Sequence, residues 1–274
     1  MLPFVVINGL AYALAGVFAG LSAGLLGVGG GIVVVPTLMF LFQYNHDVAQ
    51  NLIMPVAIGT SLAVMIFTAY ASVRAHQKQK GVQWEIYKRL AVGIILGTIT
   101  GAFIVKKLPT NEIKIIFALF LLSIAVKMLL SIIKKATTTG HGFPKAWLNH
   151  LTSYVIGCLS GLLGIGGGAM VVPYLNHCGL DIREIIPVSA IVTVTVAIIG
   201  TLSYIIVGFY TPDLPAYSSG FVYWPAVFCI ALTSVFFAPI GARLAYILPT
   251  NLLKCCFILL LLAISVKFLM DVWL

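Results

Sequence analysis

The chain has 274 residues, of which 61% are hydrophobic and only 8% are charged. A soluble domain carries about a quarter charged residues, so this composition excludes a soluble globular protein and favours one embedded in a membrane. The formal net charge of +9 does not indicate nucleic-acid binding, because the basic residues lie at the ends of apolar segments, where Lys and Arg orient a membrane protein.

The chain consists of two related halves. Residues 20–36 read GLSAGLLGVGGGIVVVP and residues 157–173 read GCLSGLLGIGGGAMVVP, with eleven of the seventeen positions identical. The sequence Leu-Pro-Thr-Asn at 108–111 recurs at 248–251. We therefore predict a first membrane repeat over 1–136, a polar linker over 137–147 and a second membrane repeat over 148–274.

Each half is predicted to contain four membrane segments, the first of which is broken. The segments are expected at about 4–42, 52–73, 90–107 and 111–133, and at about 148–176, 185–208, 222–246 and 251–272. Apolar runs of this length fit a hydrocarbon core of roughly 30 Å. The fold class is thus an all-α polytopic protein of the cell (inner or plasma) membrane. The Pro-Thr-Asn turns predict a tight antiparallel hairpin at the end of each half, because Pro suits a first helical turn.

Glycines interrupt the first segment of each half. Residues 27–31 (GVGGG) and 164–168 (GIGGG) each hold four glycines in five positions. Glycine costs about 1 kcal/mol relative to Ala in a helix, so each cluster is expected to unwind. Unwound backbone at membrane depth is tolerated only inside protein or beside a wet cavity. New helices are expected from Ile32 and Ala169, and their amide-rich N-termini attract anions.

Paired broken helices near the membrane midplane point to a transporter's substrate site. The alternative is that the glycines only allow helices to pack closely, as the four-residue spacing of Gly20 with Gly24 and of Gly157 with Gly161 suggests. The second span of each half adds hydroxyl groups at Thr60, Ser61 and Thr193. These can donate to an anion, or they can bond to their own helix or a neighbouring one.

Charged residues are few within the spans. Lys127 and Lys267 occupy matching positions and are expected to reach the nearby interface, whereas Arg243 is either an interface anchor or an anion-attracting residue at a cavity mouth. The acidic residues all fall at segment ends or in loops, which disfavours a buried carboxylate relay. They are Asp47, Glu85, Glu112, Asp181, Glu184, Asp213 and Asp271. The cysteines and histidines show no metal-ligand spacing, so we predict no metal and no cofactor.

The basic residues also predict the orientation. The loop 74–89 holds five Lys and Arg residues against Glu85 and is placed in the cytoplasm. Its counterpart, 208–223, has no basic residue and carries Asp213. This mismatch favours halves of inverted topology, in which each broken segment enters and leaves on one face as a hairpin. Inversion leaves Lys106, Lys107 and Lys267 outside as exceptions; eight simple crossings with parallel halves are the alternative.

The doubled GLLGxGGGxxxVP motif, the run Ala-Ile-Gly-Thr-Ser at 57–61 and the ending Gly-Ala-Arg-Leu-Ala followed by Leu-Pro-Thr-Asn resemble the TauE/SafE family of membrane permeases. The resemblance covers essentially the whole chain. It implies export of small sulfur-containing anions, sulfite and organosulfonates such as sulfoacetate, driven by the proton gradient or membrane potential. The family motif falls on Gly29, Gly30, Gly31, Gly166, Gly167 and Gly168, with Thr60 and Ser61. The chain departs from it at 189–193, which reads Ser-Ala-Ile-Val-Thr.

The sequence therefore predicts a secondary transporter that gives alternating access to a site between the two breaks. Its expected partners are a small anion and the lipid bilayer, with protons as a candidate coupling ion and a homo-oligomer as a candidate assembly. The candidate substrate-binding residues are Gly29, Gly30, Gly31, Gly166, Gly167, Gly168, Thr60, Ser61, Thr193 and Arg243. An anion channel, or a permease for another small anion, is the alternative. An enzyme is not expected, because the spans hold no nucleophile–base pair.

Overall fold

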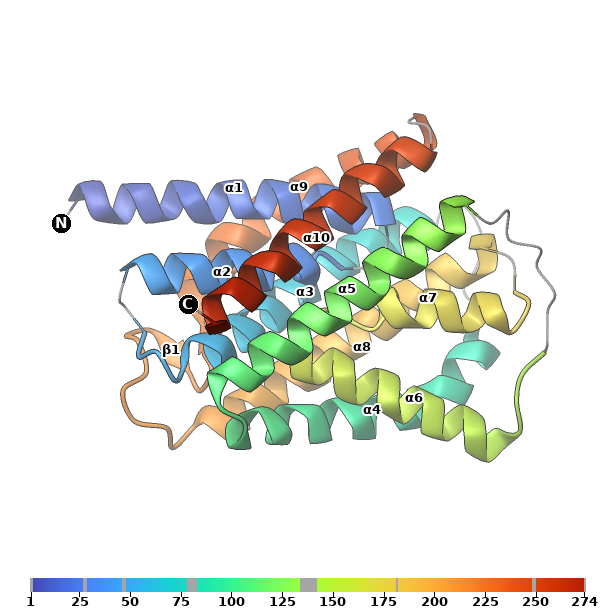
Figure 1. Ribbon diagram of the computed structural model, residues 1–274, viewed down its shortest axis with the longest axis horizontal. Helices are drawn as coiled ribbons and strands as arrows, with labels where there is room; N and C mark the ends of the chain where they lie inside the picture. Colours follow the sequence, from blue (N-terminus) through green and yellow to red (C-terminus); the bar gives the residue numbers. More distant parts are fainter. Residues whose placement is uncertain are drawn as a thin grey trace.

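The computed structural model describes residues 2–26, 29–45, 48–77, 83–133, 142–180, 182–247 and 250–273. This part of the chain forms ten α-helices and one two-stranded antiparallel sheet (Figure 1). In chain order the elements are α1 (Leu2–Leu26), α2 (Gly31–Asn45), α3 (Ile53–Gln77), α4 (Trp84–Lys107), α5 (Thr110–Ile133), α6 (Ala146–Leu163), α7 (Gly168–His177), α8 (Ile182–Gly208), β1 (Ser218–Ser219), β2 (Val222–Tyr223), α9 (Trp224–Ile247) and α10 (Thr250–Trp273).

Several predicted features fall partly outside the described residues. These are the first two residues of the first break (27 and 28), Asp47, residues 78–82 of the basic loop, the start of the linker (137–141), Asp181, and the Leu-Pro of the second turn (248 and 249).

Helix length and composition confirm the all-α polytopic fold. Within the described residues, five helices are long and apolar enough to cross a membrane, and they lie in α3, α4, α5, α8 and α9. The helices that follow the breaks are shorter, with 15 residues in α2 and 10 in α7. At 1.5 Å per residue they reach about 22 Å and about 15 Å, so neither crosses a core of roughly 30 Å alone.

The two halves interlock. Helix α1 of the first half packs along α9 of the second, and α6 of the second half packs along α4 of the first. The equivalent pairs α3 with α8 and α5 with α10 pack across the centre (Figure 1). When α1–α5 are matched in order with α6–α10, the contact of α1 with α9 corresponds to the contact of α6 with α4. The pairs α3–α8 and α5–α10 each correspond to themselves. The helix packing therefore has the twofold pattern that the repeated sequence motifs predict.

Equivalent helices run in opposite directions. Leu62 of α3 faces Gly200 of α8, whereas Gly59, which comes earlier in α3, faces Tyr204, which comes later in α8. The pair is thus antiparallel, and α5 and α10 are also seen to run in opposite directions (Figure 1). Inverted repeats require this relation. The orientation of each half in a bilayer stays a prediction.

Glycines let the interlocked helices approach closely. A Cβ on Gly97 of α4 would stand 2.1 Å from the carbonyl oxygen of Tyr154 in α6, and one on Gly161 of α6 would stand 2.6 Å from the backbone of α4. Gly20 of α1 lies equally close to the backbone of α9. The packing interpretation of Gly20 and Gly161 is therefore confirmed, as expected for small residues in membrane helix interfaces.

The hairpin predicted at 108–110 is wrong in one respect. The turn is tight, because α4 ends at Lys107 and α5 begins at Thr110. The two helices then diverge, since α4 packs on α6 and α8 whereas α5 packs on α10 and α3 (Figure 1). The glycine face of α4 fits α6, and no comparable face joins α4 to α5.

Candidate functional site

The two glycine breaks meet in the buried core. All described break residues, 29–31 and 164–168, are buried. A Cβ on Gly31 would stand 2.4 Å from the carbonyl oxygen of Gly164 and 3.0 Å from the Cα of Ile165. The first break therefore packs directly against the second, and a side chain at Gly31 would force them apart.

The breaks are unwound as predicted. Gly29 and Gly30 have φ of +80° and +81°, and Gly164 and Gly166 have φ of +64° and +82°. Side chains disfavour this left-handed region, so glycine is the residue that permits these two turns. The next helices begin at Gly31 and Gly168, each one residue before the predicted start.

Hydroxyl groups of α3 form hydrogen bonds to the unwound backbone of both breaks. Ser61 Oγ donates to the carbonyl oxygen of Gly164 at 3.1 Å, and Thr68 Oγ1 donates to that of Gly29 at 3.1 Å. Ser61 and Thr68 lie two turns apart on one helix, so α3 holds the two breaks together. The sequence predicted Ser61 but not Thr68, because Thr68 lies beyond the motif.

Thr193 of α8 touches both breaks. Its Oγ1 accepts a hydrogen bond from the Gly168 amide at 3.0 Å and donates one to the Ser189 carbonyl at 2.9 Å. Its methyl carbon lies 2.6 Å from the point where a Cβ on Gly29 would stand. The Thr193 hydroxyl thus already accepts the hydrogen bond of one amide at the start of α7. An anion bound there would contact this hydroxyl and the amides that remain unbonded.

The surroundings of the helix starts suit negative charge. The first amides of a helix have no intrahelical partner, and the aligned peptides place about half a positive charge there. No carboxylate in the described residues bonds to either break. Within the same part of the chain, no group of three His, Cys, Asp or Glu residues could hold a metal ion.

Other predicted residues lie elsewhere. Thr60 is buried, but its Oγ1 accepts from the Tyr223 amide at 3.0 Å and so connects α3 to β2. Gly167 packs against Val192 of α8. Arg243 is exposed on α9, and no hydrogen bond or ion pair joins it to the breaks in the described residues. The structure thus brings Ser61 and Thr193 to the glycines and leaves Arg243 apart.

The matching lysines stay at the periphery, as predicted. Lys127 is exposed on α5. Lys267 of α10 lies 5.4 Å from the ring centre of Phe40 and 4.0 Å from Asp271. Neither contacts a break residue among those described.

Two buried serines near the second break were not predicted as site residues. Ser160 Oγ, one turn before Gly164, and Ser189 Oγ, one turn before Thr193, have no hydrogen-bond partner in the described part of the chain. Buried hydroxyls are normally bonded, so both are available to a ligand. Serines in spans are common, and nothing in their sequence context signals this burial.

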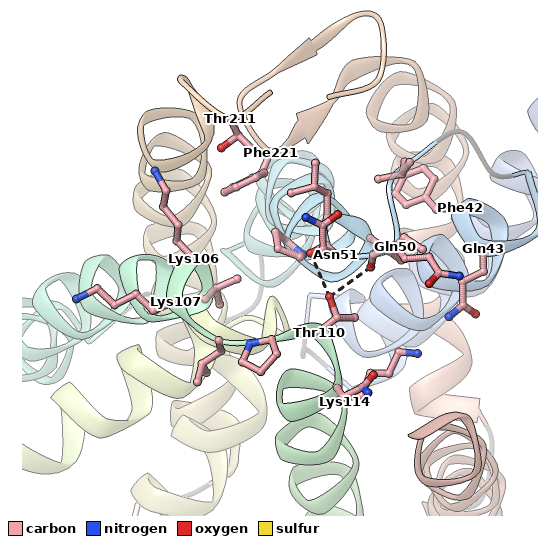
Figure 2. A pocket seen from close by; sticks show the side chains of 18 of the residues that line it. Phe42, Gln43, Gln50, Asn51, Lys106, Lys107, Thr110, Lys114, Thr211 and Phe221 are labelled. Atoms are coloured by element: carbon pink, nitrogen blue, oxygen red, sulfur yellow. Dashed lines mark hydrogen bonds between the residues drawn. The ribbon is translucent and has the colours of Figure 1, made fainter. Parts of the chain in front are cut away.

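A cavity of about 1000 Å³ opens where α2 ends, α3 begins and α4 turns into α5 (Figure 2). Its lining holds three lysines, Lys106, Lys107 and Lys114, and one carboxylate, Asp271. None of the break glycines that the structure describes lines it. Sequence reasoning did not find this cavity, because its walls come from segments far apart in the chain.

Phe221 connects the wall of this cavity to α3 and α8. It lines the cavity, and its carbonyl oxygen lies 2.5 Å from where a Cβ on Gly59 would stand. Its ring packs edge-on to Tyr204 at 6.4 Å, and Tyr204 OH donates to the Gly161 carbonyl at 3.0 Å. Phe221 therefore links the cavity wall, through Tyr204, to Gly161 of α6 near the second break.

Comparison with known proteins agrees with these features. The family model described as "Sulfite exporter TauE/SafE" matches residues 12–268. A probable membrane transporter protein of Haemophilus influenzae is 36% identical over 254 residues, covering 93% of this chain and 95% of that one. Another from Methanocaldococcus jannaschii is 25% identical over 232 residues and 84% of each chain. No solved structure matches the chain. The chain is a multi-pass membrane transporter, and it belongs to the TauE/SafE family.

Proposed function

We propose that this transporter exports a small sulfur-containing oxyanion, such as sulfite or sulfoacetate, from a site between its two glycine breaks. The observation that carries the proposal is the direct contact of the breaks in the buried core, where Gly31 meets Gly164 and each break starts a helix. The description of the matching family as a sulfite exporter supports the substrate class.

The chemistry of the breaks favours an oxyanion. A sulfite or sulfonate group presents three oxygens, which amides at the starts of α2 and α7 can bind as donors. Ser160 and Ser189 add two free hydroxyls. A helix start contributes about 0.3–1 kcal/mol toward an anion, and up to about 2 kcal/mol in buried geometry. Hydrogen bonds to charged groups contribute about 1.5–3 kcal/mol each, so a few such contacts offset the loss of water around the anion.

Alternating access, rather than a continuous pore, accounts best for the enclosed breaks. The described break glycines are buried, and none of them lines the cavity of Figure 2. Inverted halves supply two equivalent conformations, open to opposite faces, around a fixed site. In this proposal the antiparallel pair α3 and α8 carries the site, and the residues from 1 to 136 and from 148 to 274 act as the two repeats.

Flux in proteoliposomes tests the proposal. We expect saturable flux of labelled sulfite, and we expect Gly31→Val to abolish it because the new side chain would collide with Gly164. Gly9→Val is the matched control, since a Cβ at Gly9 meets nothing within 4 Å. A comparison with and without a pH gradient measures proton coupling.

Three outcomes would contradict this assignment. Normal flux in a correctly folded Gly31→Val protein would remove the site from the breaks. Flux that rises linearly with sulfite concentration would favour a channel. Absence of sulfite and sulfoacetate flux, with flux of another anion, would replace the substrate class.

A further inference from the structure

Lys114 is a buried cation to which the described part of the chain offers no partner. It lies one turn into α5, has only 5% of its surface exposed and lines the cavity of Figure 2. No hydrogen bond or ion pair to Lys114 is formed by the described residues. Burying an ammonium group is costly unless a charge or polar group compensates it. The cavity is therefore the place from which compensation for Lys114 comes.

The carboxylate in the cavity wall does not provide that compensation. Asp271 lies 4.0 Å from Lys267, one turn away on α10, and forms no ion pair with Lys114. Lys106 Nζ donates to the Val207 carbonyl at 3.2 Å, which fixes its stem, and Lys107 is exposed. Three lysines thus face one aspartate, and a concave wall with excess positive charge concentrates anions.

The cavity wall also offers neutral donors around Lys114. Thr110 Oγ1 donates to the carbonyl oxygens of Gln50 and Asn51, which pins the start of α5 to the segment before α3 (Figure 2). This places the positive end of α5 beside the amide side chains of Gln50, Asn51 and Asn111, all in the lining. The arrangement combines a buried cation, a helix start and amide donors, which together suit an oxyanion.

We infer that this cavity is a second oxyanion site, a vestibule in which Lys114 holds the anion on its path to or from the breaks. The inference rests on the proposed function and adds to it. Under the proposed inverted topology the vestibule opens on the face opposite the cytoplasm, where lysines are normally scarce. Binding of an anion then explains why Lys106 and Lys107 lie on this face, although basic residues normally gather on the cytoplasmic side.

Thiol labelling in nanodiscs tests the vestibule without requiring transport. Asn111→Cys, placed in the exposed lining, is reacted with a cationic thiol reagent in a background whose five native cysteines are replaced by Ser. We expect sulfoacetate to slow the reaction; it replaces sulfite in this assay because sulfite itself consumes thiol reagents. The half-protecting concentration should rise about tenfold in Lys114→Gln, the change that loss of one charge-assisted hydrogen bond produces. Lys114→Arg should restore protection.

Lys127→Gln, an exposed position on the same helix, is the matched control and should leave protection unchanged. Lys107→Gln is a second test at an exposed position and should weaken protection without a risk to folding. A lipid phosphate could supply the same chemistry, so nanodiscs of phosphatidylcholine are compared with nanodiscs that contain phosphatidylglycerol.

The outcomes separate this inference from the proposed function. Absence of protection by sulfoacetate, or equal protection in Lys114→Gln, overturns the vestibule even if sulfite flux depends on Gly31. Protection by phosphatidylglycerol alone, with none added by sulfoacetate, overturns it in favour of a lipid site. Protection that depends on Lys114 in a protein that moves no sulfite supports the vestibule and removes the proposed substrate.

Discussion

The hydroxyl groups around the breaks form hydrogen bonds to the break backbone, a structural role that their residue types alone did not predict. Ser61 and Thr68 satisfy break carbonyls, and Thr193 satisfies the Gly168 amide. A buried backbone group without a partner costs about 1–3 kcal/mol. These side chains therefore stabilise the unwound backbone, and a bound anion shares that network with them.

Thr193→Val tests this structural role of the hydroxyl group, because valine keeps the side-chain shape and removes the hydroxyl. The Gly168 amide loses its acceptor, so we expect the free energy of unfolding to fall by about 1–3 kcal/mol. The measurement is denaturant unfolding of the purified protein in detergent. Thr152→Val is the control, since Thr152 is exposed and bonds only within its own helix. Equal losses in the two variants would contradict a special role for Thr193.

At the residue scale, the sequence predicted the break glycines and could not predict their partners. Glycine acts locally through its helix propensity, so Gly31 and Gly168 mark the helix starts to within one residue. Which hydroxyl reaches which carbonyl depends on how α3 and α8 cross, and that is a tertiary property. Thr60 and Ser61 are adjacent in sequence, yet Ser61 bonds to the second break and Thr60 to β2.

At the scale of elements, glycine faces decide which helices pair. Gly93, Gly97 and Gly101 repeat every four residues on α4 and lie against α6. The same spacing was predicted to serve packing in α1 and α6. The divergence of α4 and α5 was missed because a two-residue turn suggests a local hairpin, whereas the fitting surface for α4 belongs to the other half.

Gly97→Ala should destabilise the α4–α6 pair. The new Cβ would stand 2.1 Å from the Tyr154 carbonyl oxygen, so the helices must separate, at a cost of about 1–3 kcal/mol. Thermal unfolding in detergent measures the loss. Gly9→Ala, where the space is open, should be neutral or slightly stabilising. A melting temperature unchanged by Gly97→Ala would show that the interface is looser than the distances indicate.

At the scale of the whole molecule, the proposed inverted topology makes a direct prediction about sidedness. The β1–β2 segment and the α4–α5 turn lie near one end of the molecule, together with both marked termini (Figure 1). The basic residues around Lys88 belong to the cytoplasmic end in the proposed topology. Asp213→Cys should therefore react with an impermeant thiol reagent in intact cells, and Lys88→Cys should react only after permeabilisation.

Parallel halves predict the opposite result at one of these positions. With eight simple crossings, the loop at Asp213 would lie on the same side as Lys88, and both cysteines would need permeabilised cells. Both positions are exposed, so accessibility within the protein does not limit the reaction.

The interlocking of the halves also constrains how the protein is made. Helix α1 leaves the ribosome before the seven helices α2 to α8, yet the partner along its length is α9, which follows them. Until α9 is synthesised, the glycine face of α1 lacks its native partner and can contact other helices or lipid. Contacts of such long sequence separation form slowly. Helix α1 thus contacts its permanent neighbour only after seven intervening helices have been synthesised.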